Sequence, residues 1–421
     1  MRGLRAKRMR TVKEGTLIAT VDIGAVTNTG YCTSMDGRDI KVFRFANTKE
    51  GFEKFWHMIV SSKNRFECSE VAVGFESTGP YAEPLVHYLK AKPVRIVQVN
   101  PMHTKRLKEV NDNSPGKTDD KDPRVIADVL RLGHALSVIV PEGDAAYLRR
   151  LNNARERHVR ERTALLNQMQ QLVFLIFPEF NTVVKQMRGR TVRFILRHYT
   201  TPDKIGSLDR EAFGVELRKR SRGRFGIKEA ERLIDLAQKT VGIKEGLHGI
   251  VLDIQHIIAQ LDVVDRFTSD IEVEMASTLE RIPASVRLLS IKGLGVISVA
   301  GLIGEVGDFS KFRTQSEIMK LAGLDLYEVS SGKRKGQKRI SKRGRSLMRK
   351  ILYFAAIQMI GTRGIMHDYY ERLTARGMLK MRALVAVMRK LLRIIHAIMR
   401  DDRNYMGEYC APKRRVIKKA A

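Results

Sequence analysis

The longest regular pattern in the chain is a run of mostly apolar positions, spaced alternately three and four residues apart, over residues 247–282. This heptad spacing predicts one continuous helix that buries a narrow stripe against a partner helix. Pro283 ends the helix, because proline has no amide proton to donate. The stripe consists of Leu247, Ile250, Ile254, Ile257, Leu261, Val264, Thr268, Ile271, Met275, Thr278 and Ile282.

A second long helix is predicted from Asp144, a suitable N-cap, to Pro178. The two helices predict a coiled coil, within one chain or between protomers, and packing in a bundle is the alternative. Arg155 and Arg162 interrupt the apolar stripe of this helix, which favours solvated positions and contact with nucleic acid equally. The basic segment 188–224 predicts a small helical insert. The second stripe consists of Leu148, Leu151, Leu165, Met169, Leu172 and Ile176.

Strand and helix patterns alternate nearer the N-terminus. The strand at 71–76 is apolar throughout, which predicts a central place in a sheet. The order βββαβαβ, followed by a helix at Pro123, is typical of a ribonuclease-H-like (Holliday-junction-resolvase-like) α/β domain. The predicted strands are 16–24, 30–34, 40–45, 71–76 and 94–99, and the predicted helices are 49–61 and 81–90.

Acidic residues stand where such a domain binds metal ions. Asp22 and Glu76 each follow an apolar strand, and Asp119, Asp120 and Asp122 come together before the late helix. Phosphodiester cleavage with two Mg²⁺ ions needs several carboxylates around a small volume. The ordered set therefore predicts a Mg²⁺ site.

Asp122 also has a simpler explanation. Residues 110–116 are rich in Asn, Asp, Pro and Gly and are predicted to form a loop. Asp122 would then be the N-cap of the next helix and Pro123 its first residue. Taken alone, an Asp in this context is far more often a cap than a ligand.

The charge of the chain points to a polyanionic partner. Lys and Arg number 77 against 46 Asp and Glu among 421 residues, a formal net charge of +31. Neutralising phosphates releases condensed counterions, which favours nucleic acid as the partner.

Cysteine usage and hydropathy indicate a soluble intracellular protein of a reducing cytoplasm. Cys32, Cys68 and Cys410 show no paired spacing, which argues against disulfides and structural zinc. Residues 1–13 are basic but lack the apolar core of a signal peptide. Apolar runs such as 351–360 are too short to span a bilayer.

The C-terminal part combines glycines, serines and cations. Residues 288–300 predict a helix-hairpin-helix in which Gly293 and Gly295 would let the backbone approach a phosphate, and a plain turn is the alternative. A Ser330-Ser331-Gly332 loop is followed by a basic cluster that predicts a phosphate-binding surface. This basic cluster comprises Lys333, Arg334, Lys335, Lys338, Arg339, Lys342, Arg343 and Arg345. Amphipathic helices are predicted at 349–360 and 381–399.

These patterns divide the chain into five parts. They are a basic arm (1–15), the ribonuclease-H-like domain (16–140), a helical and coiled-coil region with the insert (141–283), a mostly α-helical C-terminal domain (284–405) and a basic tail (406–421).

Several short motifs, in order along the chain, resemble the insertion-sequence-110 family of transposases, which includes a site-specific DNA invertase. They are Asp22-Ile23-Gly24, Glu76-Ser77-Thr78-Gly79, Lys117-Thr118-Asp119 with Asp122, Gly293-Leu294-Gly295, Gly304-Glu305-Val306-Gly307-Asp308, Leu321-Ala322-Gly323-Leu324, Ser330-Ser331-Gly332 and Ile340-Ser341-Lys342-Arg343-Gly344. Two positions depart from the family pattern: Pro123 replaces a usual Ala, and Asp325-Leu326 replaces Ala-Pro.

The resemblance implies a recombinase that joins a DEDD metal site to a nucleophilic serine on a separate domain. Its acidic set would be Asp22, Glu76, Asp119 and Asp122, and its serine Ser331, with Ser330 as the alternative. It further implies Mg²⁺, donor and target DNA, a guide RNA encoded by the element, and a homo-oligomer, dimer or tetramer.

Two other functions remain open from the residues. The carboxylates could serve a structure-specific nuclease that uses water and forms no covalent intermediate. A non-catalytic nucleic-acid-binding coiled-coil protein would need the acids only as caps and surface charges, which their order at strand ends disfavours.

Overall fold

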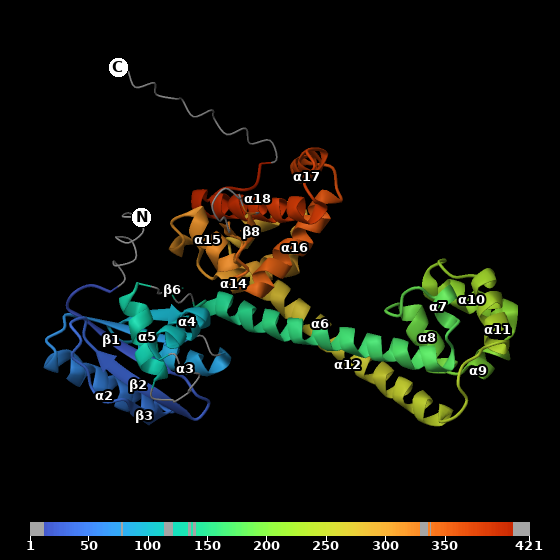
Figure 1. The fold of residues 1–421 in the computed structure, drawn as a ribbon. Coiled ribbons are helices and arrows are strands. Elements are labelled where there is room, and N and C mark those ends of the chain that lie inside the picture. Colours follow the sequence, from blue (N-terminus) through green and yellow to red (C-terminus); the bar gives the residue numbers. More distant parts are fainter. Residues whose placement is uncertain are drawn as a thin grey trace, which may run out of the picture. The chain divides into compact units, whose positions relative to one another are not determined.

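The computed structural model describes residues 12–76, 79–112, 121–133, 136–137, 140–328, 336 and 338–406 (Figure 1). Two compact units make up the chain, Met1–Ile139 and Val140–Ala421. The further division of the second unit at 283 stays a prediction.

The first unit is built on a six-stranded mixed sheet in the order β3-β2-β1-β4-β5-β6. β1 pairs with β2 antiparallel and with β4 parallel, and β4 pairs with β5 parallel, so the apolar strand β4 is central as predicted. The strands are β1 (Thr16–Asp22), β2 (Thr27–Thr33), β3 (Phe43–Ala46), β4 (Glu70–Glu76), β5 (Arg95–Val99) and β6 (Leu136–Ser137).

Helices cover both faces of this sheet. The helices that contact its strands are α2 (Lys49–Arg65), α3 (Ala82–Lys90) and α5 (Asp122–Arg131). The short η1 (Gly79–Tyr81) contacts α3, and α4 (Pro101–Asp112) contacts α5. On one face the ring of Phe55 in α2 stacks on Phe45 of β3 with centroids 4.8 Å apart. On the other face α5 lies over β1 and β4. The predicted order βββαβαβ is confirmed, and the mixed α/β sheet is compatible with a ribonuclease-H-like fold.

Helix α4 contradicts part of the predicted loop. It runs through residues 110–112, whereas the remaining loop residues 113–116 lie outside the described ones. Asn100 starts the helix, because its Oδ1 accepts a hydrogen bond from the Met102 amide at 2.9 Å. Pro101 suits the first turn, where no amide donor is needed.

The start of α5 corrects the predicted cap by one residue. The carbonyl of Lys121 accepts the first helical hydrogen bond, from the Val125 amide at 3.0 Å, so Lys121 is the N-cap. Asp122 is already helical and makes no capping bond. Its carboxylate is therefore available for another contact.

The second unit contains the two long helices, α6 (Gly143–Ile176) and α12 (Leu247–Glu280), each of 34 residues. They pack against each other within one chain, and the pairs Arg155–Glu272 and Arg162–Asp265 show that they run antiparallel. The two arginines thus pair with acids of α12. The predictions for them were solvated positions or contact with nucleic acid, and neither included these ion pairs. A coiled-coil supercoil stays a prediction.

The apolar stripe of α12 is largely used inside the chain. Ile254, Ile257, Leu261 and Val264 are buried in one core with α6 and the insert. By length and composition alone α12 could also cross a membrane, a weak criterion that core helices meet as well.

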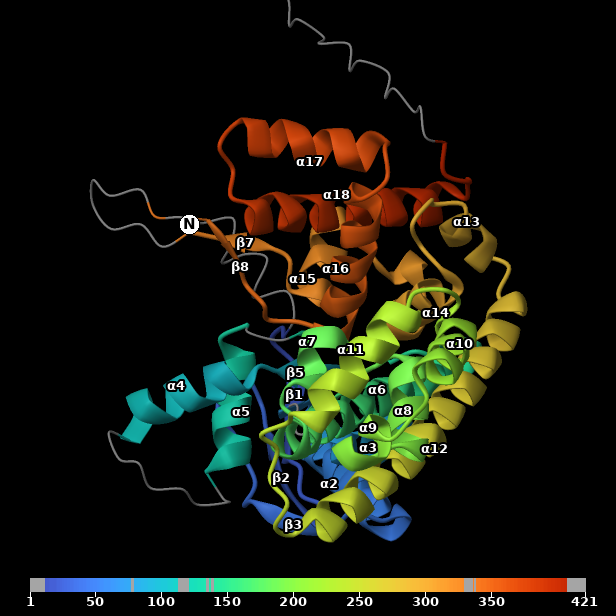
Figure 2. The same cartoon turned by 90° about the vertical axis from the view of Figure 1, so that its right-hand side faces the viewer.

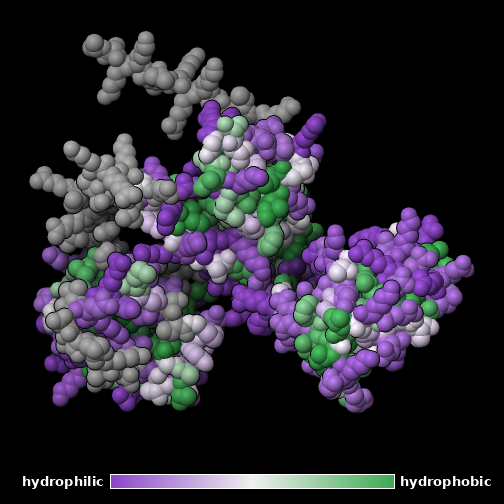
Figure 3. All heavy atoms as spheres, turned by 45° about the vertical axis from the view of Figure 1, so that its right-hand side comes forward, coloured by the Kyte–Doolittle hydropathy of each residue, from purple (hydrophilic) through white to green (hydrophobic). Residues whose placement is uncertain are grey.

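Five short helices lie between α6 and α12, three of them within the insert predicted at 188–224. They are α7 (Phe180–Val183), α8 (Arg190–His198), α9 (Pro202–Gly206), α10 (Arg210–Ser221) and α11 (Ile227–Gln238). Phe180, Ile195 and Leu233 fill their shared core. The face of the insert that Figure 3 shows is mostly hydrophilic, with a smaller apolar patch.

The remaining elements are helical apart from one hairpin. They are α13 (Ser285–Leu289), α14 (Val296–Val306), η2 (Phe309–Lys311), α15 (Gln315–Ala322), β7 (Leu326–Tyr327), β8 (Arg339–Ile340), α16 (Ser346–Ile360), α17 (Ile365–Ala375) and α18 (Lys380–Asp401). The predicted helices α16 and α18 are confirmed. Helix α17, which lies alongside α18 (Figure 2), and the β7–β8 hairpin were not predicted.

Packing within the protein accounts for one glycine of the predicted helix-hairpin-helix. Gly293 has φ +98, and a Cβ there would lie 2.6 Å from Cγ of Met359. Both facts require glycine without any phosphate nearby. A turn between α13 and α14 is present, and a helix-hairpin-helix that binds DNA stays a prediction.

Candidate functional site

Two of the predicted carboxylates lie next to each other because of strand register. β1 and β4 run parallel with Val21 opposite Phe75, and the next residues are Asp22 and Glu76. Neighbouring strands are about 4.8 Å apart. Asp22 and Glu76 therefore occupy equivalent positions at the carboxyl ends of two adjacent strands.

Both side chains lie on the face that α5 covers. Side chains two residues apart on a strand share a face. Thr20, two before Asp22, donates through Oγ1 to the carbonyl of Pro123 at 2.6 Å. At Gly74, two before Glu76, a Cβ would lie 2.3 Å from Cδ1 of Leu130 in α5. Only glycine at that position lets α5 approach the sheet so closely.

Asp122 brings a third carboxylate to the same face and edge. It precedes Pro123, whose carbonyl contacts Thr20, and it is the first residue of α5. Its Oδ1 forms an ion pair with Nζ of Lys108 from α4. Asp119 and Asp120 lie outside the described residues.

Helix α4 also holds Glu76. The hydroxyl of Thr104, only 2% exposed, contacts Oε2 of Glu76 at 2.8 Å. Neither Thr104 nor Lys108 was predicted as a site residue, because apolar periodicity predicts no helix in this segment. The pair Asn100-Pro101, a cap followed by a favoured first residue, was the signal that could have found it.

The second predicted site lies in sequence between strands β7 and β8. Leu326 pairs with Ile340 and Tyr327 with Arg339. The intervening residues 329–335 and 337, which include Ser330, Ser331, Gly332, Lys333, Arg334 and Lys335, lie outside the described ones. The described hairpin therefore connects to both ends of the predicted serine loop.

The described cations of the basic cluster fall into two groups. Lys338, Arg339, Lys342 and Arg343 are exposed. Arg345 is largely buried beside Glu305, and burial lowers the pKa of its guanidinium to about 10. The first group presents charge to solvent, whereas Arg345 packs inside the second unit.

Comparison with known proteins decides the family. Residues 19–178 match a family model described as a transposase with the DEDD domain of IS110, and residues 285–371 match the "Transposase IS116/IS110/IS902 family" model. Together these matches span more than half of the 421 residues. The chain belongs to the IS110 family of transposases.

Individual relatives agree with this assignment. A 43.6 kDa protein of insertion element IS110 from Streptomyces coelicolor is 25% identical over 71% of this chain and 75% of its own length. A 42 kDa protein of insertion element IS900 from Mycobacterium paratuberculosis is 27% identical over 69% and 73%. A pilin gene-inverting protein from Moraxella bovis is 29% identical over 28% and 37%.

As an IS110-family transposase, the protein is an enzyme of DNA transposition and recombination, and DNA is its partner. The DEDD domain of the family suggests a divalent cation. Within the described residues, no three His, Cys, Asp or Glu side chains lie close enough together to hold a metal ion.

The donor chemistry at the sheet edge nevertheless fits such an ion. Asp22, Glu76 and Asp122 offer only carboxylate oxygens, the ligands that Mg²⁺ prefers. The ammonium of Lys108 already places a positive charge against Asp122.

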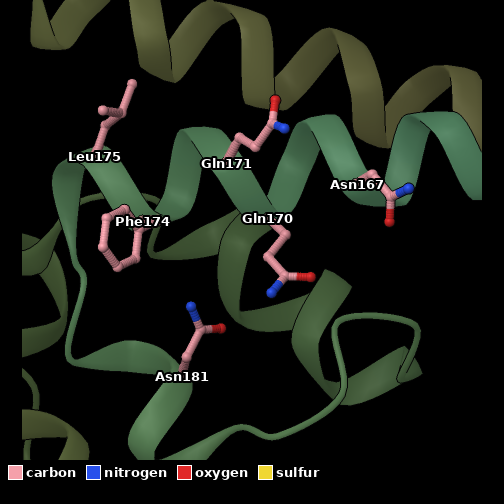
Figure 4. Close-up of a pocket in the computed structure, with 6 residues that line it drawn as sticks. All are labelled: Asn167, Gln170, Gln171, Phe174, Leu175 and Asn181. Atoms are coloured by element: carbon pink, nitrogen blue, oxygen red, sulfur yellow. The ribbon is translucent and has the colours of Figure 1, made fainter.

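A separate groove of about 550 Å³ in the transposase lies between α6 and α7 (Figure 4). Its walls are carboxamide and apolar side chains: Asn167, Gln170, Gln171, Phe174, Leu175 and Asn181. None of these lining groups is titratable, so the groove offers no acid–base or nucleophilic chemistry.

Proposed function

We propose that this transposase cuts and rejoins DNA strands with a Mg²⁺ site formed by Asp22, Glu76, Asp119 and Asp122 and with Ser331 as nucleophile. The observation that carries the proposal is the register of β1 and β4, which sets Asp22 beside Glu76 under the first turn of α5. Two like charges at adjacent strand ends are unfavourable unless a cation neutralises them.

A bound divalent cation would supply charge neutralisation at the reacting phosphate. The protein's own residues supply the rest. Asp22 and Glu76 would hold the ion from the strand ends, and Asp119 and Asp122 would do so from the start of α5. The Ser331 oxygen would form an ester to phosphorus as a DNA hydroxyl leaves, and a second DNA hydroxyl would later displace the serine.

The exposed cations beside the serine loop would hold the flanking phosphates. Lys338, Arg339, Lys342 and Arg343 come directly after the loop, and all are exposed. Lys333, Arg334 and Lys335 would extend this surface. Gly293 and Gly295 would bring the turn before α14 close to a further phosphate.

The nucleic acid that directs the reaction would be a non-coding RNA of the element. The net charge of +31 gives the protein affinity for RNA as well as DNA. Sequencing the nucleic acid that co-purifies with the protein tests this directly. Affinity for the element's own RNA no better than for random RNA would leave a role in DNA binding alone. A cytoplasmic, nucleoid-associated location would follow from these partners.

A homo-oligomer, dimer or tetramer, would bring the serine of one site to the acids of the same or another protomer. Residues of α12 that its packing leaves exposed provide an apolar surface for such assembly. They are Leu252, Val263, Phe267 and Val273.

Trapping reaction intermediates on a nicked substrate tests the serine. A phosphoserine at Ser331, lost in Ser331→Ala with binding retained, is the expected result. Full recombination by that variant would move the role to Ser330. Activity in both single variants and in the double variant would identify a nuclease that uses water.

A further inference from the structure

One face of helix α4 contacts the carboxylate site twice. Thr104 and Lys108 are four residues apart and therefore lie on the same side of the helix. Thr104 contacts Glu76 at the end of β4, and Lys108 contacts Asp122 at the start of α5. Leu107, between them in sequence, packs on the core beneath the sheet.

The two contacts differ in chemistry. Thr104 is buried, and its hydroxyl has one proton to donate, to Oε2 of Glu76 at 2.8 Å or to the carbonyl of Pro101 at 2.9 Å. The Lys108–Asp122 pair is ionic and partly shielded, with side-chain exposures of 35% and 14%. The Lys108 ammonium occupies Oδ1 of Asp122 and neutralises its charge, whereas a divalent cation would need both for binding.

We propose that Lys108 is a built-in counter-ion of the metal site, which a divalent cation displaces from Asp122, and that Thr104 is a positioning residue that holds Glu76. This inference rests on the proposed use of Asp22, Glu76 and Asp122 as metal ligands. Lys108 offsets the repulsion among these carboxylates before metal binds, and it lowers their affinity for the metal by competing for Asp122.

Binding of Mn²⁺ to the full-length, metal-free protein tests the proposal without catalysis. Free Mn²⁺ is measured by electron paramagnetic resonance in the absence of nucleic acid. Lys108→Met should bind Mn²⁺ about tenfold more tightly, because a unit positive charge next to a ligand is removed. Lys105→Met is the matched control, since Lys105 is exposed on the same helix and carries the same charge. It should change the affinity by no more than about twofold.

The partner of Lys108 is tested by a double variant. In an Asp122→Asn background, Lys108→Met should no longer tighten Mn²⁺ binding. Thr104→Val should weaken it about tenfold, because the Glu76 carboxylate loses its hydrogen bond. If Lys108→Met does not fold, Lys108→Gln removes the charge and keeps a polar end, and the same tightening is expected.

The outcomes separate this inference from the proposed function. The proposed metal site would be overturned if the wild-type protein showed no saturable Mn²⁺ binding, or if Asp22→Asn left the binding unchanged. The role of Lys108 alone would be overturned if Mn²⁺ binding were lost in Asp22→Asn but the Mn²⁺ affinities of Lys108→Met and Lys105→Met were equal. Wild-type affinity in Thr104→Val would overturn the role of Thr104.

Discussion

Acidic residues are held in opposite ways in the two units of this transposase. On α12, Asp262, Asp265 and Glu272 each pair with an arginine from α6 or α8. At the sheet edge of the first unit, Asp22 and Glu76 occupy equivalent positions on neighbouring parallel strands. The acids of α12 stabilise the packing of the helices through their arginines, whereas Asp22 and Glu76 place like charge on neighbouring strand ends, where Lys108 already pairs with Asp122.

Removing the charge of Asp22 or Glu76 should have the largest effect, and that effect should be on catalysis. Asp22→Asn or Glu76→Gln should lower strand cleavage by at least about a thousandfold, since each removes a charged ligand at nearly constant volume. The melting temperature should stay the same or rise slightly, because a like charge is removed. Near-normal recombination by either variant would contradict the proposed metal site. Asp120→Asn is the control and should be better tolerated.

Neutralising an acid of α12 should instead cost stability. Asp265 accepts a hydrogen bond from Nε of Arg162 at 2.6 Å and also pairs with Arg193, whose side chain is only 12% exposed. Asp265→Asn should lower the free energy of unfolding by about 2 kcal/mol, because Arg162 and Arg193 both lose this counter-charge and Arg193 keeps its pair with Asp262 at 3.3 Å. Denaturant titration measures this. Asp270→Asn, at an exposed position of the same helix, should change it by less than about 0.5 kcal/mol.

The stability that the ion pairs of Asp265 provide should depend on pH. Burial alone would raise the pKa of Asp265, but hydrogen bonds from Arg193 and Arg162 outweigh it and hold the pKa below its usual value. A lowered folded pKa gives stability that is present above the unfolded value of about 3.9 and lost as pH falls below it. The stability difference between wild type and Asp265→Asn should therefore shrink as pH falls from about 5 through the folded pKa of Asp265. A difference that is constant over this range would argue against the ion pair.

The smallest effects are expected for two arginines near the serine loop, the exposed Arg339 and the largely buried Arg345. Arg339→Met should lower the slope of log affinity against log salt for DNA by about 1, because an exposed phosphate contact is lost. Arg345→Met should leave the slope unchanged and lower the melting temperature, since Arg345 pairs with the buried Glu305. Equal slopes in wild type and Arg339→Met would show that Arg339 does not contact a DNA phosphate.

Much of the architecture could be predicted from local patterns. The central strand β4, both long helices and helices α16 and α18 follow from apolar periodicity. Helix α4 could not be found this way, because its sequence is polar and its amphipathic pattern weak. Helix α17 lacks a continuous buried stripe, with Met366 its one fully buried residue among those described.

The sequence by itself determined the order of the elements and which residues could carry the chemistry. Apolar periodicity and capping are local properties, and Asp22 and Glu76 could be recognised as strand-end acids without a structure. Which residues meet was decided only by tertiary structure. The register of β1 with β4, the glycine that lets α5 approach, and the contacts of Thr104 and Lys108 all join residues far apart in the chain. Such pairings depend on how whole elements pack, because a shift of one residue between β1 and β4 would turn one acid to the opposite face from the other.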